Sequence, residues 1–240
     1  MSCGEYESYI LGDEEIKFLL AGLGMERLCG ILDSDGPEKM DTDTRNRALL
    51  SLYEKQVIDL AEGEVSIRPE LSDFFRVILG SGQCISVHAG GRDMPVRCGY
   101  FSHGKVVMME RCQRREGTLK LSFWTQPQWI LFLESIMEEL ASEYGRVSRK
   151  LEKAKTVCLE EEECLREENI AAVFVRRDIG KMEARQKILI KENGLETYMI
   201  LRNGADCVQK PYKKKELMRA VSAWMEEKND TGRYLYSGDR

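Results

Sequence analysis

Two stretches of this chain follow one pattern, in which a β-like run is followed by a proline and an amphipathic helix. The first spans 119–139 and contains Pro127; the second spans 206–227 and contains Pro211, and each ends in Met-Glu-Glu. Proline suits the first position of a helix, where its missing N–H is not needed. The repetition predicts an internal duplication with pseudo-two-fold symmetry.

Two Asn-Gly pairs, at 193–194 and 203–204, each separate two apolar β-like runs. Asn-Gly strongly favours a type I′ hairpin turn, which needs positive φ at both central residues. The pattern therefore predicts an antiparallel meander over 170–210. Candidate strands of an earlier meander are 84–88, 96–102, 105–112 and 118–124.

The N-terminal third predicts a helical module. After a loose lead-in over residues 1–12, Asp13 can cap a first helix. A second helix is predicted over 42–60, a short strand over 64–68, and a third helix from Pro69 to Gly80. This order resembles a winged-helix module. The 42–60 helix carries no cationic surplus, because acidic residues balance its basic ones, so we expect no specific DNA binding.

From Gln128 onward the pattern stays helical for about forty residues. Apolar residues recur at alternating spacings of three and four, which is the heptad pattern of a helix that meets another helix. We predict that this seam and the basic residues beside it form a protein-association surface; an ordinary core seam with a solvated basic face is the alternative. The predicted surface comprises Met137, Leu140, Tyr144, Val147, Leu151, Ala154, Arg146, Arg149 and Lys150.

Together these patterns predict an α+β protein. Its antiparallel sheet is built from two pseudo-repeated meander–helix units, with an N-terminal winged-helix-like module and a long central helix. The predicted segments are 1–82 for the N-terminal module, 83–140 for the first meander and helix, 141–169 for the continuing central helix, 170–228 for the second meander and helix, and 229–240 for a polar tail.

The charge and the cysteine pattern limit the partners and the cellular compartment that we expect for this protein. The 240 residues carry a net charge of −5, which weakly disfavours nucleic acid and anionic membranes as partners. We expect no signal peptide and no membrane span. The eight cysteines form no Cys-x-x-Cys and fall in apolar runs, so we expect them to be reduced in a cytoplasmic protein.

No set of residues in the sequence indicates a particular catalytic or ligand-binding chemistry. The two histidines, His88 and His103, fall at a strand end and in a turn, which does not match metal-ligand spacing. No Gly-rich stretch continues into the Gly-Lys-Ser/Thr of a phosphate loop. We therefore expect no catalytic residues, no metal and no cofactor, and we expect that the protein is not an enzyme.

The whole order of elements resembles the EspG-like proteins of bacterial type VII (ESX) secretion. The likeness is carried by residues 42–79 and by the two strand–proline–helix units, and it covers most of the chain. It implies a cytosolic chaperone or adaptor that holds an effector before export. We expect protein partners, with small secreted helical proteins as candidates and a homodimer as a further candidate assembly. It brings no catalytic residues and assigns no substrate contacts. The rival interpretation is a winged-helix transcriptional regulator with a ligand-sensing β-rich domain.

Overall fold

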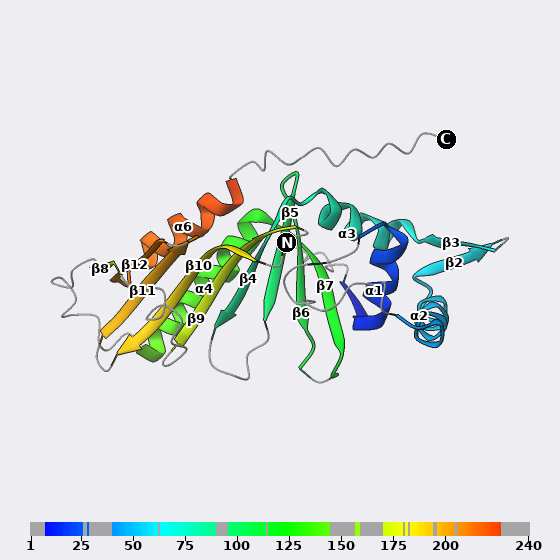
Figure 1. The fold of residues 1–240 in the computed structure, drawn as a ribbon, viewed down its shortest axis with the longest axis horizontal. Coiled ribbons are helices and arrows are strands. Elements are labelled where there is room, and N and C mark those ends of the chain that lie inside the picture. Colours follow the sequence, from blue (N-terminus) through cyan, green and yellow to red (C-terminus); the bar gives the residue numbers. More distant parts are fainter. Residues whose placement is uncertain are drawn as a thin grey trace, which may run out of the picture.

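The computed structural model describes residues 8–25, 28, 40–61, 63–89, 96–113, 115–144, 157–158, 170–179, 181, 183–193, 196–204 and 206–226. Ten strands form one sheet in the order β1-β7-β6-β5-β4-β9-β10-β11-β12-β8, and every neighbouring pair is antiparallel (Figure 1). The strands are β1 (Ser8–Gly12), β4 (Gln83–Ala89), β5 (Arg97–Ser102), β6 (Lys105–Arg111), β7 (Thr118–Thr125), β8 (Val157–Cys158), β9 (Ile170–Asp178), β10 (Ala184–Asn193), β11 (Glu196–Asn203) and β12 (Asp206–Pro211).

The sheet consists of two four-stranded meanders, β4 to β7 and β9 to β12, which join edge to edge. Strands β4 and β9 pair antiparallel from Gln83 opposite Asp178 to Ala89 opposite Ala172. A pseudo-two-fold axis normal to the sheet requires such an antiparallel pair at the boundary. The predicted α+β class with an antiparallel sheet of two meander–helix units is confirmed.

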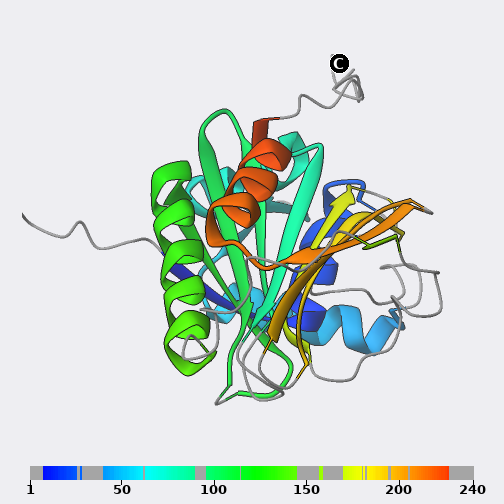
Figure 2. The same ribbon diagram turned by 90° about the vertical axis from the view of Figure 1, so that its left-hand side faces the viewer.

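Each meander is followed by a helix, α4 (Gln126–Tyr144) after the first and α6 (Lys214–Glu226) after the second. Both helices contact the same apolar cluster on one face of the sheet, and they contact each other (Figure 2). Their buried residues correspond at a constant offset of 88 in residue number. The corresponding pairs are Trp129 and Leu217, Leu133 and Val221, and Ile136 and Trp224.

The start of α4 is determined by local sequence. The backbone N–H of Thr125 donates to Gln128 Oε1 at 2.7 Å, and the backbone N–H of Gln128 donates to Thr125 Oγ1 at 3.4 Å. These reciprocal bonds form a capping box, which satisfies two N–H groups that the helix itself leaves without partners. Pro127 lies inside this first turn, as the sequence predicted.

The opposite face of the first meander is covered by α1 (Asp13–Gly22) and α3 (Pro69–Gly80). Apolar residues of β7 that point to this face, Leu119 and Leu121, are completely buried. Phe74 of α3 packs on Phe123 with ring centroids 3.9 Å apart. The first meander is therefore a middle layer between two helical layers.

Helix α2 (Thr42–Glu54) is joined to α1 by one buried carboxylate. Glu15 accepts hydrogen bonds at 2.6 Å from the backbone N–H of Gly12, from Ser51 Oγ and from Lys55 Nζ. Buried charges are tolerated when they are paired and hydrogen-bonded in this way. Glu15 thus fixes α2 against the end of α1.

The structure corrects two predictions for the N-terminal third. Residues 8–12 are not a loose lead-in, because they form β1 on β7 with Ser8 opposite Ser122. The helix predicted over 42–60 ends at Glu54, because Gln56 has a φ of 58° and reverses the chain. Residues 58–61 then form β2 (Ile58–Ala61), which pairs with β3 (Glu64–Ile67) as a hairpin.

Two further predictions are wrong in the C-terminal half. Pro211 does not open a helix: it ends β12, where no ladder N–H is needed, and α6 begins at Lys214. The helix predicted to continue through 141–169 does not include Val157 and Cys158, which pair as β8 with Gln209 and Val208. The helical spacing of apolar residues in the sequence gives no information on whether residues 157–158 pair with β12.

The cysteines are also not all reduced. Cys84, Cys98 and Cys112 form no disulfide, as expected, whereas Cys207 is disulfide-bonded. In the described part of the chain, no helix is both long enough and apolar enough to span a membrane.

Candidate functional site

The predicted association seam is placed only at its first residue. Met137 of α4 is completely buried in the apolar cluster between the two helices and the sheet. The Tyr212 hydroxyl donates a hydrogen bond to Met137 Sδ at 3.5 Å, and burial raises the pKa of Tyr212. Met137 therefore contributes to the core that joins α4 to the second meander.

The other predicted residues are not brought together by the described structure. Leu140 and Tyr144 lie within α4, but their side chains are not among those that the structure describes. The remaining members lie outside the described residues; they are Arg146, Val147, Arg149, Lys150, Leu151 and Ala154. The seam stays a prediction from the sequence.

The structure instead forms a pocket over the first meander, on the same face as α4. Register places Lys120 of β7 opposite Glu110 of β6, and Glu110 opposite Arg97 of β5. The next row on this face places Ser122 opposite Met108. These two rows and the first turns of α4 enclose a pocket of about 330 Å³. Its lining residues are Ser8, Arg97, Met108, Glu110, Lys120, Ser122, Trp124, Gln128 and Phe132.

One wall of the pocket is charged. Arg97 Nε donates to Glu110 Oε2 at 3.0 Å, whereas Lys120 Nζ lies 3.9 Å from Glu110 Oε1. The Arg97 guanidinium also lies 5.1 Å from the ring centroid of Phe132, a cation–π distance. The row of three charges therefore has one carboxylate, which Arg97 neutralises, and one additional positive charge on Lys120.

The other wall is aromatic. Trp124 and Phe132 meet edge to face, with centroids 5.5 Å apart and planes at 75°. Trp124 Nε1 donates to Ser122 Oγ at 2.9 Å, which fixes the orientation of the indole. The pocket thus combines an apolar wall with a cationic end, an arrangement suited to binding rather than to covalent chemistry.

A second candidate surface lies at one end of the long axis of the molecule, where the β2–β3 hairpin projects beyond α2 and α3 (Figure 1). Leu60 and Val65 face each other in the register of the hairpin and are 43% and 46% exposed. On the outer side of α2, Leu50 and Tyr53 are 58% and 51% exposed. These four residues are called here the hairpin surface.

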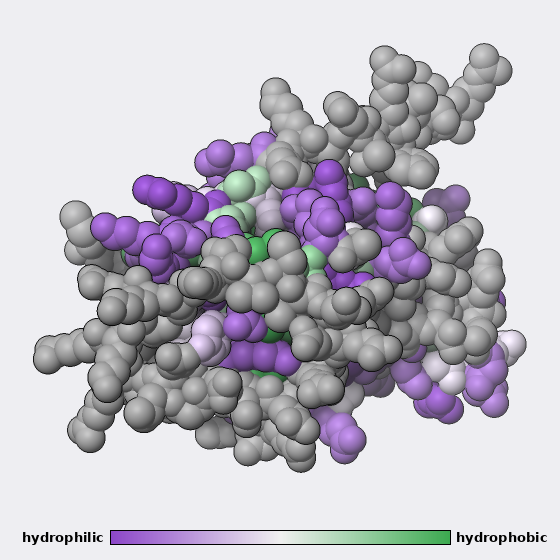
Figure 3. Space-filling model, turned by 60° about the vertical axis from the view of Figure 1, so that its left-hand side comes forward, coloured by the Kyte–Doolittle hydropathy of each residue, from purple (hydrophilic) through white to green (hydrophobic). Residues whose placement is uncertain are grey.

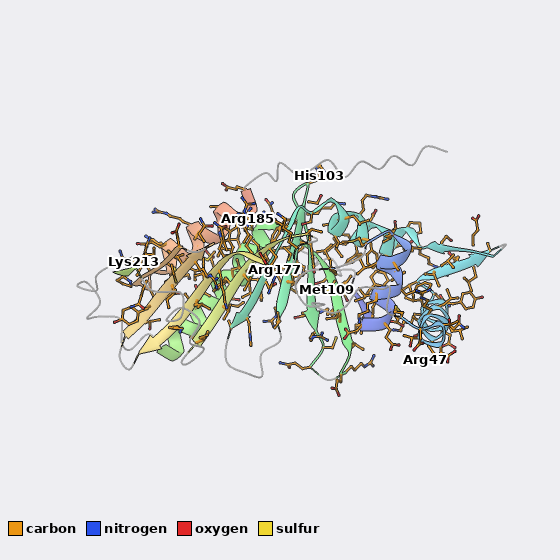
Figure 4. All side chains as sticks on the ribbon, in the orientation of Figure 1. Arg47, His103, Met109, Arg177, Arg185 and Lys213 are labelled. Carbon is orange, nitrogen blue, oxygen red and sulfur yellow. The ribbon has the colours of Figure 1, made fainter. Side chains whose placement is uncertain are left out.

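Polar side chains lie at both ends of the molecule and in the turn between β5 and β6. Arg47 on α2 and Lys213 before α6 lie near opposite ends of the long axis, and His103 lies in the turn between β5 and β6 (Figure 4). On the side that brings α6 and the second meander forward, hydrophilic side chains dominate the coloured surface (Figure 3). Among the described residues, no group of three His, Cys, Asp or Glu side chains is arranged to hold a metal ion.

Sequence reasoning did not find the pocket residues. Arg97, Glu110 and Lys120 are separated by 10 to 13 residues and share no motif. The only available signal was alternation in the last strand of the meander, where Lys120 and Ser122 alternate with apolar residues. That signal predicts a common face, but it does not identify which residues of β5 and β6 lie beside them.

No known protein family matches the sequence, and no curated protein sequence is detectably similar to it. Among solved structures, the fold is similar to the Mycobacterium tuberculosis type VII secretion system chaperone EspG5, solved in complex with a PE25–PPE41 dimer. The TM-score is 0.55 at 8% sequence identity, over 90% of this chain and 95% of that chain. The likeness therefore extends over nearly the whole of both chains and concerns the fold.

Proposed function

We propose that this protein is a chaperone or adaptor that binds small helical proteins destined for type VII secretion. The observation that carries the proposal is the fold likeness to EspG5, because it covers 90% of this chain. EspG5 is a chaperone in complex with a PE25–PPE41 dimer, so a protein partner is the role that this likeness favours.

The hairpin surface supports a protein partner on physical grounds. Ile58 and Ile67 lie on the same face of the hairpin as Leu60 and Val65. Ile58 and Ile67 pack into the core at the base of the hairpin, whereas Leu60 and Val65 remain exposed. The apolar face thus continues outward from the core without cover. Exposed apolar groups that gather in this way mark protein interfaces more often than chance.

The chemistry of the hairpin surface favours an amphipathic helix as the bound element. Leu50 and Tyr53 are three residues apart on α2, so they project from neighbouring turns of one helix face. An incoming helix can match this spacing with its own i, i+3 and i+4 anchors. Tyr53 suits such a site, because its ring can be buried while its hydroxyl stays hydrated.

Co-expression tests the proposal. The chain is expressed with each small helical secreted protein that is encoded beside it, and complexes are identified by affinity capture followed by size-exclusion chromatography. We expect one of these proteins to co-purify stoichiometrically. If none of them forms a complex with the wild-type chain, the chaperone proposal is wrong.

Matched variants then test the hairpin surface separately. We expect the double substitution Leu60→Asp and Val65→Asp to abolish co-purification without changing the thermal unfolding midpoint. The control is Leu131→Asp, because Leu131 is 63% exposed on α4, far along the chain from the hairpin. Equal complex formation by both variants would leave the chaperone role intact and place the interface elsewhere, with the 137–154 seam as the next candidate.

A further inference from the structure

The pocket over β5, β6 and β7 has the size and mixed lining of a small-ligand site. Its volume of about 330 Å³ lies at the lower end of the range for ligand pockets. Its floor is Met108 and Ser122, which are both buried, and one side is formed by the first turns of α4. It therefore suits a compact ligand that lies between the sheet and the helix.

The aromatic wall of the pocket selects a flat apolar group. Phe132 and Trp124 present ring edges and faces at a steep angle to each other, and Met108 adds an adaptable thioether beneath them. The indole is held in place by its hydrogen bond to Ser122. Because these rings are already oriented, binding a planar group requires little ordering of side chains.

The charged row of the pocket selects an anion. Glu110 is one carboxylate between two cations, Arg97 at 3.0 Å and Lys120 at 3.9 Å, so this row carries one net positive charge. The side chain of Lys120 is 41% exposed, and its distance of 3.9 Å from Glu110 is too long for a hydrogen bond. Ser122 Oγ accepts from Trp124, and its O–H group can still donate to another acceptor. An ammonium and a hydroxyl donor thus both line the pocket.

We infer that this pocket binds a carboxylate attached to a flat apolar body, with the carboxylate on Lys120 and Ser122 and the body against Trp124 and Phe132. Two sources have this chemistry: a free aryl-alkanoic acid and the terminal carboxylate of a peptide whose last residue is aromatic. The inference concerns a different surface from the hairpin and does not depend on the proposed chaperone role.

Nuclear magnetic resonance of the indole N–H groups tests the inference. The chain has three tryptophans, and of these only Trp124 lines the pocket; Trp129 and Trp224 are buried in the core. The probe is 3-phenylpropionate, and the neutral comparison is 3-phenylpropionamide. We expect the acid to shift the Trp124 signal saturably and the amide to bind at least about tenfold more weakly, since a charge-assisted hydrogen bond is lost.

Two lysine variants distinguish the effect of the pocket's charge on binding from the effect of the protein's net charge. Lys120→Met is expected to weaken binding of 3-phenylpropionate about tenfold or more and to leave binding of the amide unchanged. Lys105→Met removes the same charge from an exposed residue outside the pocket, and we expect it to bind the acid like the wild type. Equal weakening in both variants would overturn the assignment of the carboxylate to Lys120.

Short peptides distinguish the two sources. A tetrapeptide that ends in phenylalanine is titrated with a free and with an amidated C-terminus. Tighter binding of the free peptide than of 3-phenylpropionate identifies a terminal carboxylate, and binding of 3-phenylpropionate alone identifies a free acid. If neither acid perturbs Trp124 saturably at millimolar concentration, or if acid and amide bind equally, the inference is wrong.

Discussion

Gln83 of β4 accepts a hydrogen bond at Oε1 from the Nε–H of Arg176 on β9, across the boundary between the two meanders. Both side chains are buried, Arg176 completely. The Gln83 amide also donates to the carbonyl of Trp224 near the end of α6, and Arg176 Nη1 donates to Gln186 Oε1 at 2.9 Å. One buried network therefore connects both meanders with the closing helix.

This network predicts a strong effect of Gln83→Leu. The substitution leaves a buried guanidinium without one of its acceptors, which costs about 2–4 kcal/mol of unfolding free energy. Urea denaturation of the purified protein measures the change. The double substitution Gln83→Leu and Arg176→Met should be more stable than the sum of the single effects, because it removes both polar partners. Additive effects would show that the two side chains act independently.

Alanine substitutions at two glycines are expected to change the unfolding free energy in opposite directions. A Cβ on Gly99 of β5 would lie 2.9 Å from the Phe101 ring and 3.1 Å from the Trp129 ring, where α4 sits on the sheet. We expect Gly99→Ala to lower the unfolding free energy by about 1–3 kcal/mol through overpacking. A Cβ on Gly22 of α1 meets nothing within 4 Å, so Gly22→Ala should be neutral or stabilise by up to about 1 kcal/mol. Similar unfolding midpoints for the two variants would contradict this account.

The 137–154 seam remains testable by substitution. We expect the double change Val147→Glu and Leu151→Glu to abolish self-association or partner capture while thermal unfolding stays nearly unchanged, because a heptad stripe buries its apolar residues against another helix. Analytical ultracentrifugation and calorimetry measure the two properties. A variant that is insoluble, or a monomer with a much lower melting temperature, would instead assign the seam to the core.

The α2 surface predicts that the protein does not bind specific DNA. Its exposed residues Arg45 and Arg47 are offset by Asp41 and Asp43, and Lys55 is paired with Glu15. Phosphate contacts supply most protein–DNA affinity and need a cationic surplus. A gel-shift titration with duplex from the upstream region of the gene at physiological salt should show no specific complex. A salt-sensitive, sub-micromolar shift would favour the transcriptional-regulator interpretation.

Local sequence determined the strands, most of the helices and thereby the fold class. The last strand of the first meander was predicted at 118–124 and is Thr118–Thr125, because its residues alternate between two faces. The hairpins after Asn193 and Asn203 were predicted from Asn-Gly, and β10, β11 and β12 are joined at these positions. The predicted type I′ turn with Asn203 at a central position is wrong, because Asn203 pairs with Asp206 as the last residue of β11 and the positive φ of 61° is at Gly204. Each of these signals depends on neighbouring residues, so it can be recognised without knowledge of the partner strand.

Only the tertiary structure decided which distant segments meet. Residues 8–12 form a strand because β7 offers them an open edge, and Val157 and Cys158 pair with β12 rather than extending a helix. The pocket arises in the same way, because Lys120, Glu110 and Arg97 become neighbours only when three strands adopt one register. Strand register is determined by the packing of each meander against the helices that cover it. For that reason the sequence predicted the elements of this protein, whereas the pocket over the first meander emerged only from their assembly.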